Sequence, residues 1–335
     1  METVYFLGID ISKKKFDAAL TQDGSTMHEL IVTNSASAIK VAFRALKKEF
    51  GFSYDRLVVC IEHTGIYCQH LLDFAVEQGI RVCQEPALQI KQSQGIVRGK
   101  SDRIDAKRIA AYAFKNREQL KFWSPQRQVV QKLKALLVVR ERLVRAKVQL
   151  QTPLIESQEF IEGSICKTMA KCCQKTLKAL AEDIDKIEQE IDGLLAFDQN
   201  LSEQIKYATS VTGIGKITAA NVIVTTGEFK RIAEPKKFAC YSGIAPFEHT
   251  SGSSIKGRAR VSKMANMTIK KLLHLSAMAA IRSDQEIKLF YARKVKEGKN
   301  KMSVINAVRN KLISRVFACV KNQRMYEKTY QHALV

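Results

Sequence analysis

The chain has 335 residues, 46% of them hydrophobic, which is enough apolar material for two or three globular cores. Its formal net charge is +22. It contains no apolar stretch of about eighteen residues, and its first residues lack the layout of a signal peptide, so a secreted or membrane-spanning protein is not expected. We expect a soluble, cytoplasmic protein.

The positive charge is concentrated in the last third of the chain. Residues 201–335 contain 25 Lys and Arg but only 8 Asp and Glu, a net charge of +17. Such a segment is expected to bind a polyanion, either nucleic acid or an anionic membrane surface. Because the basic residues are spread over several segments and not along one amphipathic helix, nucleic acid is favoured and a membrane partner is not expected.

The eight cysteines give no support for a metal site. None forms a Cys-x-x-Cys pair, so zinc ligation lacks its usual spacing. Most are expected to be small buried apolar residues in a reducing compartment.

The first 120 residues alternate between predicted strands and helices. Strands are predicted at residues 4–11, 16–20, 28–34, 56–62 and 81–86, and helices at 36–50 and 66–79. Three strands joined by tight turns, followed by helix, strand, helix and strand, predict an α/β sheet that mixes antiparallel and parallel pairs. This is the element order of a ribonuclease-H-like core, so residues 1–120 are predicted to form one domain.

Residues 121–200 have helical patterns instead. A helix is predicted at 129–151, which Pro153 is expected to limit. A heptad seam in a second helix then steps by three and four through Leu177, Leu180, Ile184, Ile187, Ile191 and Leu194. The segment is predicted to be a coiled-coil arm, and the seam fits a hairpin within one chain and an oligomer of several chains equally well.

Residues 201–335 are predicted to form a mainly helical third domain. Helices are predicted on both sides of a Gly-x-Gly turn in 210–224, then at 233–243, about 266–282, 284–297 and 302–321. Ser283 and Glu286 have the spacing of a capping box for the helix at 284–297.

The Gly-x-Gly turn resembles that of a helix-hairpin-helix motif. Gly213 and Gly215 allow a close backbone approach, and the N–H groups that start the next helix can bind a phosphate oxygen. Lys216 adds a positive charge beside them. Such a turn binds duplex DNA without reading its sequence.

Four carboxylates have positions that can converge. Asp10 and Glu62 end apolar strands, and Asp102 and Asp105 lie three apart at the start of a predicted helix. Each one alone is more often an ordinary surface acid, but together they would repel each other unless a cation neutralised them. Hard oxygen ligands suit Mg²⁺, with Mn²⁺ as an alternative, and paired ions of this kind support phosphodiester chemistry.

The stretch 251–260, with the sequence SGSSIKGRAR, combines three serines with several cations. It reads either as a flexible basic loop that touches phosphate or as the site of a nucleophilic serine. Its pattern alone does not choose among the serines.

Five motifs in this order resemble one family. They are a Gly-Ile-Asp strand, a strand-end Glu followed by HTGIY, a Lys-Ser-Asp-x-x-Asp-Ala segment, a TGIG turn and the stretch SGSSIKGRARVSK. Together they resemble the DEDD-type transposases of bacterial insertion sequences, which include the Piv-type DNA invertases. The resemblance implies an N-terminal domain like the junction resolvase RuvC, a coiled-coil connection and a C-terminal transposase domain.

The resemblance also implies roles for residues. Asp10, Glu62, Asp102 and Asp105 would be the catalytic, metal-binding tetrad, and Ser251 would be the catalytic serine. It further implies an enzyme that recombines donor and target double-stranded DNA as a dimer or tetramer, guided by a structured bridge RNA.

Activation of Ser251 is open at this point. His249 could serve as its base, but we favour a metal held by the tetrad that polarises the scissile phosphate. Nearby cations would then balance phosphate charge or hold the strand: Lys256, Arg258, Arg260 and Lys263. Two rival functions are a metal-only junction nuclease that uses water and a non-catalytic nucleic-acid-binding protein.

Overall fold

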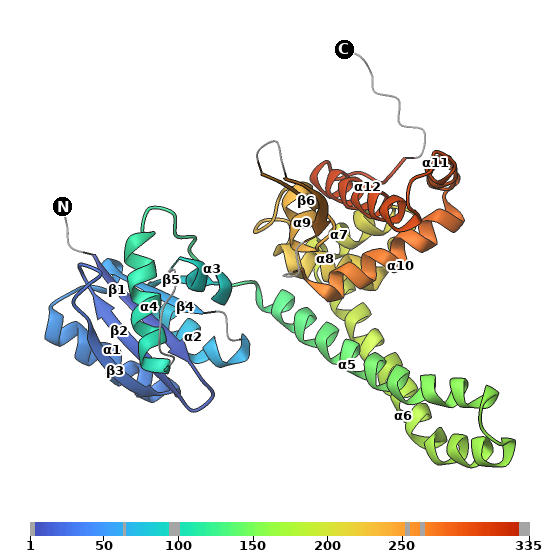
Figure 1. Cartoon of the computed structure of the whole chain (residues 1–335). Helices are drawn as coiled ribbons and strands as arrows, with labels where there is room; N and C mark the ends of the chain where they lie inside the picture. Colours follow the sequence, from blue (N-terminus) through green and yellow to red (C-terminus); the bar gives the residue numbers. More distant parts are fainter. Residues whose placement is uncertain (1–3, 63–64, 94–100, 252–254, 262–264, 328–335) are drawn as a thin grey trace. The chain divides into compact units, whose positions relative to one another are not determined.

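The computed structural model describes residues 4–62, 65–93, 101–251, 255–261 and 265–327 (Figure 1). Between residues 247 and 260 it describes the backbone of two strands but not their side chains. The chain forms two compact units, residues 1–125 and 126–335. In the described ranges, no helix is long and apolar enough to cross a membrane. The division into three domains stays a prediction.

A five-stranded sheet forms the centre of the first unit. Its strands are β1 (Tyr5–Ile11), β2 (Lys15–Thr21), β3 (His28–Thr33), β4 (Leu57–Glu62) and β5 (Arg81–Glu85). Their order is β3-β2-β1-β4-β5, with antiparallel pairs up to β1 and parallel pairs beyond it. The predicted mixed sheet is therefore confirmed.

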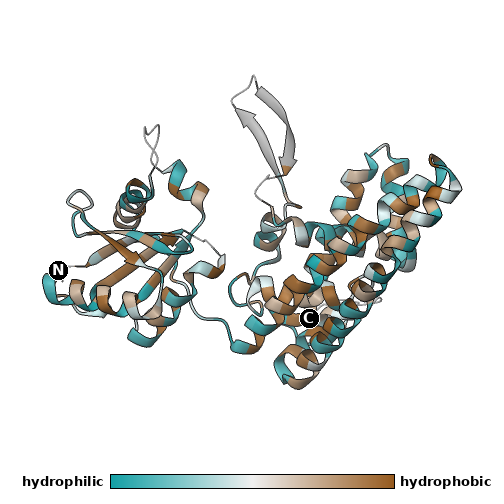
Figure 2. Cartoon of the chain, turned by 90° about the horizontal axis from the view of Figure 1, so that it is seen from below, coloured by the Kyte–Doolittle hydropathy of each residue, from teal (hydrophilic) through white to brown (hydrophobic). Residues whose placement is uncertain are grey.

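Alternating side chains on the strands supply two different cores. Leu7, Ile9 and Ile11 of β1 pack with α1 (Ala36–Phe50) and α2 (Gln69–Gln78) on one face. The other face packs against α4 (Asp102–Lys115), and α3 (Ala87–Gln92) contributes Ile90 to the same core. The central strands are mostly apolar (Figure 2). Helices therefore cover both faces of β1.

Two long helices, α5 (Gln128–Glu156) and α6 (Gly163–Phe197), pack against each other as a hairpin in the second unit (Figure 1). Every residue of the predicted heptad seam is buried or half-buried. The seam thus has partners within its own chain, while the coiled-coil geometry and the oligomeric state stay predictions.

The prediction that Pro153 limits α5 is wrong, because the helix continues through it to Glu156. A proline inside a helix removes one hydrogen bond and leaves the carbonyl four residues earlier without its usual partner. Here both Pro153 and Gln149 are exposed, so water can satisfy that carbonyl.

The rest of the second unit is mainly helical, as predicted. It contains α7 (Gln199–Thr209), α8 (Lys216–Thr226), α9 (Pro235–Tyr241), α10 (Met267–Ser283), α11 (Gln285–Lys296) and α12 (Lys301–Lys321). The predicted capping box at Ser283 is wrong. Ser283 ends α10, and the Asp284 carboxylate instead caps α11 by accepting from the N–H groups of Glu286 and Ile287.

The serine stretch is a β-hairpin and not simply a loop. Strand β6 (Pro246–Ser251) pairs antiparallel with β7 (Ile255–Val261), and Ser251 is opposite Ile255. Residues 252–254 lie outside the described residues.

Candidate active site: an acidic sheet edge and a serine hairpin

The acidic site begins with the register of the sheet. Ile9 of β1 pairs with Ile61 of β4, so Asp10 and Glu62 are the next residues along two neighbouring strands. Both follow buried apolar runs, with Glu62 as the last residue of β4 and Asp10 as the last but one of β1. The pairing therefore brings two of the four predicted carboxylates to one edge of the sheet, as the sequence predicted.

Helix α4 brings the other two carboxylates to the same face. Its packing depends on Gly8, because a Cβ added there would lie 2.1 Å from the backbone nitrogen of Ala110 and 2.5 Å from the carbonyl oxygen of Ala106. Gly8 and Asp10 are two residues apart on β1 and share a face. The glycine thus lets the helix lie directly on the strand that carries Asp10.

The start of α4 is fixed by local contacts. Ser101 caps the helix by accepting from the N–H of Ile104, so Asp102 and Asp105 lie in its first turn. Glu29 of β3 forms ion pairs with Arg103 and Lys107 of the same helix. These contacts hold the two aspartates near the strand ends.

The charges of the gathered acids act on one another. The pKa of Asp10 is raised to about 6, first by burial and then by the negative charges of Asp102, Asp105, Glu62 and Asp17. The charges of Glu62, Asp102 and Asp105 therefore lie close enough to Asp10 to raise its pKa.

The two helix carboxylates have cations of their own. Lys15 Nζ lies 2.8 Å from Asp17 Oδ2 and 3.8 Å from Asp102 Oδ2. Arg108 Nη1 donates to Asp105 Oδ1 over 2.8 Å. Among the described residues, no three His, Cys, Asp or Glu side chains are gathered closely enough to hold a metal ion as they stand.

The donor set nevertheless fits a hard divalent cation. All four predicted ligands are carboxylates, and the raised pKa of Asp10 reflects burial together with the negative charges of the neighbouring acids. A cation would relieve that repulsion. Asp10, Glu62, Asp102 and Asp105 are the residues that would hold it.

Sequence reasoning missed two further acids, which lie on the strands next to Asp10 and Glu62. Asp17 is directly opposite Asp10 on β2 and is 4% exposed, and Glu85 is opposite Glu62 on β5 and is 8% exposed. Cys83 Sγ donates to Glu85 over 3.2 Å. The signal for Asp17 was available, because a tight hairpin after Asp10 fixes which residue of the returning strand is opposite it.

Polar contacts hold the base of the hairpin that carries Ser251. Asn306 Nδ2 of α12 donates to the carbonyl oxygen of Ile244 over 2.5 Å, two residues before β6. On the other side, the N–H of Asn266 donates to the Tyr241 carbonyl over 3.0 Å, and its side chain caps α10. Ser251 therefore ends a strand whose base is anchored to three helices.

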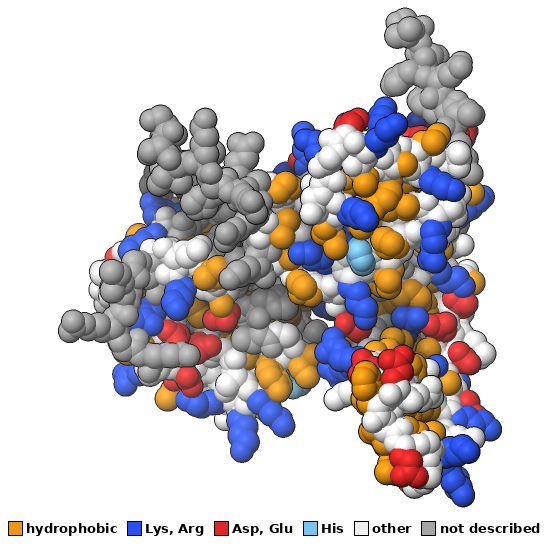
Figure 3. Space-filling view, turned by 45° about the vertical axis from the view of Figure 1, so that its right-hand side comes forward, with side chains coloured by type: hydrophobic (Ala, Val, Ile, Leu, Met, Phe, Trp, Pro, Cys, Tyr) orange, Lys and Arg blue, Asp and Glu red, His pale blue; other side chains and the backbone are white. Residues whose placement is uncertain are grey.

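The predicted cations of this region lie mainly on β7. Lys256, Arg258 and Arg260 belong to that strand, and Lys263 lies outside the described residues. On the face shown in Figure 3, Lys and Arg side chains are dispersed among apolar and neutral ones and form no single continuous band.

The predicted Gly-x-Gly turn connects α7 and α8, and its two glycines differ. Gly213 has a φ of +94°, and a Cβ there would lie 2.6 Å from the Ser276 carbonyl oxygen of α10. Gly213 thus allows the turn to pack closely against α10. Gly215 and Lys216 are exposed at the start of α8, and Lys216 Nζ lies 2.7 Å from Asp192 Oδ2.

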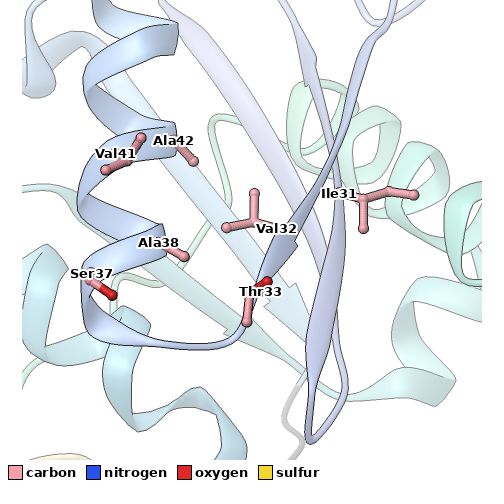
Figure 4. A pocket seen from close by; sticks show the side chains of 7 residues that line it. All are labelled: Ile31, Val32, Thr33, Ser37, Ala38, Val41 and Ala42. Atoms are coloured by element: carbon pink, nitrogen blue, oxygen red, sulfur yellow. The ribbon is translucent and has the colours of Figure 1, made fainter.

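A hollow of about 410 Å³ between β3 and α1 is distinct from these sites (Figure 4). Its lining includes no acid or base: Ile31, Val32, Thr33, Ser37, Ala38, Val41 and Ala42. It offers no group for phosphodiester chemistry.

Comparison with known proteins identifies the class of enzyme. Residues 7–157 match a DEDD family model described as "Transposase", and residues 206–292 match one described as "Transposase IS116/IS110/IS902 family". The two matches together cover more than half of the chain. The chain therefore belongs to the IS110-type insertion-sequence transposases, a family of DNA transposases and recombinases.

Individual relatives agree with this assignment. The pilin gene-inverting protein of Moraxella lacunata is 25% identical over 331 residues, which cover 96% of this chain and 98% of that protein. The transposase for insertion sequence element IS1111A of Coxiella burnetii is 24% identical over 257 residues, 68% of each chain. Among solved structures, T. thermophilus RuvC in complex with a Holliday junction matches 36% of this chain and 99% of its own, with 16% identity and a TM-score of 0.29.

Proposed function

We propose that this transposase cleaves and exchanges DNA strands through Ser251, assisted by Mg²⁺ held by Asp10, Glu62, Asp102 and Asp105. The observation that carries the proposal is the convergence of these carboxylates on one sheet edge, in a chain of a transposase family. Donor and target double-stranded DNA are the proposed substrates. The tetrad and Ser251 of one active site would meet in the assembled complex, from one chain or from two.

The proposed reaction is a transesterification. The Ser251 hydroxyl gives up its proton as its oxygen attacks the phosphorus of a DNA phosphodiester, the bond to one deoxyribose oxygen breaks, and that oxygen takes up one proton in return. The product is a serine–phosphate ester that joins protein and DNA. Strand exchange reverses the step with a new deoxyribose hydroxyl, so the energy of the ester is retained.

Two groups of residues would support this chemistry. A bound Mg²⁺ supplies positive charge that polarises the scissile phosphate. Lys256, Arg258 and Arg260 of β7, with Lys263, hold the strand and balance the charge that develops on the phosphate oxygens. His249, two residues before Ser251 on the same strand, is the alternative base.

Binding of the duplex is assigned to the Gly-x-Gly turn. The exposed start of α8 at Gly215 and Lys216 presents N–H groups and a positive charge to a phosphate. Gly213 supports this turn through its contact with α10. The contact would bind DNA without reading its sequence.

We also propose that a structured bridge RNA guides the enzyme and that it works as a dimer or tetramer. Both proposals rest on the resemblance to the DEDD transposases. The net charge of +17 in residues 201–335 agrees with binding of long polyanions. RNA that copurifies with the enzyme and is required for recombination would support a guide.

The mechanism is tested by comparing Ser251→Ala with Asp102→Asn on a DNA substrate that carries both recombination ends. Both variants are expected to lower recombination by about a thousandfold or more, because each removes a reacting or metal-binding group. Both variants should therefore lack the covalent protein–DNA adduct, but only Asp102→Asn should also weaken metal binding, which Ser251→Ala should leave intact. Ser283→Ala, an exposed helix-end serine, is the matched control and should recombine normally.

Three other outcomes would contradict the proposal. Normal recombination by Ser251→Ala excludes the serine mechanism. Cleavage that requires Asp102 but not Ser251 indicates a nuclease that uses water. Nucleic-acid binding without any metal-dependent cleavage, in the wild type as well as in both variants, indicates that the chain only binds nucleic acid.

A further inference from the structure

The acidic edge is the end of β1 and β4 where Asp10, Glu62, Asp102 and Asp105 gather. It also contains a lysine, Lys15, that none of the five family motifs includes. Lys15 lies on β2, two residues before Asp17, so both side chains share the face that carries Asp10. Its Nζ lies 2.8 Å from Asp17 Oδ2 and 3.8 Å from Asp102 Oδ2. One ammonium group thus joins a sheet carboxylate to a helix carboxylate of the tetrad.

We propose that Lys15 is an internal counter-ion of the acidic site, which competes with the divalent cation for Asp102. The inference rests on the proposed function, because it assumes that the tetrad binds a metal. It assigns to Lys15 control over how tightly the metal-free enzyme takes up its cation.

The need for such a counter-ion follows from the sheet register. Asp17 and Asp10 are directly opposite each other on antiparallel strands, and like charges in such pairs are destabilising. Asp17 is also buried, at 4% exposure, and a buried carboxylate without a partner is costly. Lys15 supplies that partner and neutralises one charge of the opposed pair.

The ammonium group is placed to compete and is free to move. The side chain of Lys15 is 45% exposed and that of Asp102 is 60% exposed, so their ion pair is open to water. A lysine has a flexible four-carbon stem and can leave such a pair at little cost. Asp17 keeps its place on β2, while Asp102 becomes available to a metal.

The ion pairs of the site explain why its carboxylates are not drawn together around one point. In the described part of the chain, the carboxylates do not form a ready metal site, although they are close enough to raise the pKa of Asp10. Lys15 holds Asp102, and Arg108 holds Asp105. No ion pair among the described residues reaches Asp10 or Glu62, so the direct ion pairs of the tetrad are those of its two helix aspartates.

The test is a titration of Mn²⁺ into the purified full chain without nucleic acid, at one fixed ionic strength, followed by calorimetry. Lys15→Met is expected to bind Mn²⁺ about three- to tenfold more tightly than the wild type, because one positive charge beside the site is gone. The control is Lys14→Met, which removes the same charge from an exposed neighbour that has no ion pair among the described residues. Its affinity should stay within about twofold of the wild type.

A double variant separates competition from simple charge. Lys15→Met with Asp17→Asn keeps the net charge of the wild-type site but removes the competitor of the metal at Asp102. It should still bind Mn²⁺ more tightly than the wild type, and it also avoids the unpaired buried carboxylate that could unfold the single variant.

Each result decides the inference. Mn²⁺ affinity of the double variant that is unchanged or weaker than that of the wild type overturns it, whatever the single variant does. If wild-type binding is too weak to measure, the inference is overturned when the double variant also shows no measurable binding. Binding that is lost in Asp10→Asn but unchanged in the Lys15 variants overturns this inference and leaves the proposed metal site standing. A wild type that needs no divalent cation for recombination overturns the proposed function instead.

Discussion

The acidic edge of the first unit and the serine hairpin of the second are built on opposite principles. Asp10 and Glu62 are on strands with buried apolar cores on both faces, and the helix that carries Asp102 and Asp105 packs closely on β1 at Gly8. The hairpin is a two-stranded ribbon, anchored at its base by hydrogen bonds from Asn306 and Asn266. A two-stranded ribbon alone is marginally stable in water.

The two regions differ in the forces that hold their functional groups in place. Carboxylates that repel each other must be held by the surrounding structure, since their own interactions drive them apart. The described contacts at the base of the serine hairpin are hydrogen bonds from Asn306 and Asn266. Packing therefore holds the acids of the first region, and polar contacts anchor the base of the second.

The largest expected effect is that of Gly8→Ala on the acidic edge. The added methyl group collides with the backbone of α4, which cannot move aside as a side chain would. We expect a loss of about 3 kcal/mol or more in the free energy of unfolding, measured by urea denaturation, together with loss of DNA cleavage.

The matched control is Gly193→Ala in α6, where an added Cβ meets nothing within 4 Å. A glycine inside a helix costs stability, so this variant should gain up to about 1 kcal/mol. Equal effects of the two substitutions would show that Gly8 does not set the distance between β1 and α4.

A smaller effect is expected at the hairpin base. Asn306→Ala removes the donor to the buried residue Ile244 and leaves that carbonyl without this partner, at a cost of about 1–2 kcal/mol. Faster proteolysis within residues 246–261 and slower recombination should follow, with the fold of the first unit unchanged.

Asn310→Ala is the control for the hairpin, since among the described residues the Asn310 amide donates to a carbonyl of its own helix. It should alter the unfolding free energy by less than about 0.5 kcal/mol. Similar proteolysis of both variants would mean that Asn306 does not anchor the ribbon.

The sheet and most helices follow from local sequence. The helix at 36–50 was predicted with the observed bounds, and buried apolar runs marked β1 and β4. Asp10 and Glu62 came together because both end such runs, which is a local signal. Gly8 was noted only as part of the Gly-Ile-Asp motif and Lys15 was not noted at all, because their roles depend on a helix about a hundred residues later.

The errors have physical causes of the same kind. The serine stretch contains two glycines and several polar residues, a composition typical of loops, so the pairing of β6 with β7 was not visible. The cap of α11 was placed one residue early, because Ser283 donates to the Ala279 carbonyl while the Asp284 carboxylate is free to accept. Local patterns rank both residues as good caps.

The smallest expected effect is that of Asp10→Asn on the free energy of unfolding, because the neighbouring acids disfavour the charged form of Asp10. The pKa of Asp10 is raised from 3.8 to about 6, so folding favours its protonated form. Its contribution to stability is present below about pH 4 and is lost as the pH rises to about 6. Metal-free Asp10→Asn should therefore be more stable than the wild type at pH 7.5. We expect about 1 kcal/mol, since solvent screens this half-buried group, and the difference should vanish near pH 4.

Urea denaturation of both proteins at the two pH values, with a chelator present, measures this difference. Asp198→Asn is the control of opposite sign, because Arg127 Nη1 donates to the Asp198 carboxylate over 2.7 Å and lowers its pKa. That variant should be less stable than the wild type at pH 7.5, with a deficit that shrinks as the pH falls through the acid range. A destabilised Asp10→Asn at pH 7.5 would mean that the acidic edge is already compensated by Lys15 and Arg108. The contrast between an edge held against its own charge and a hairpin held by its anchors would then be wrong.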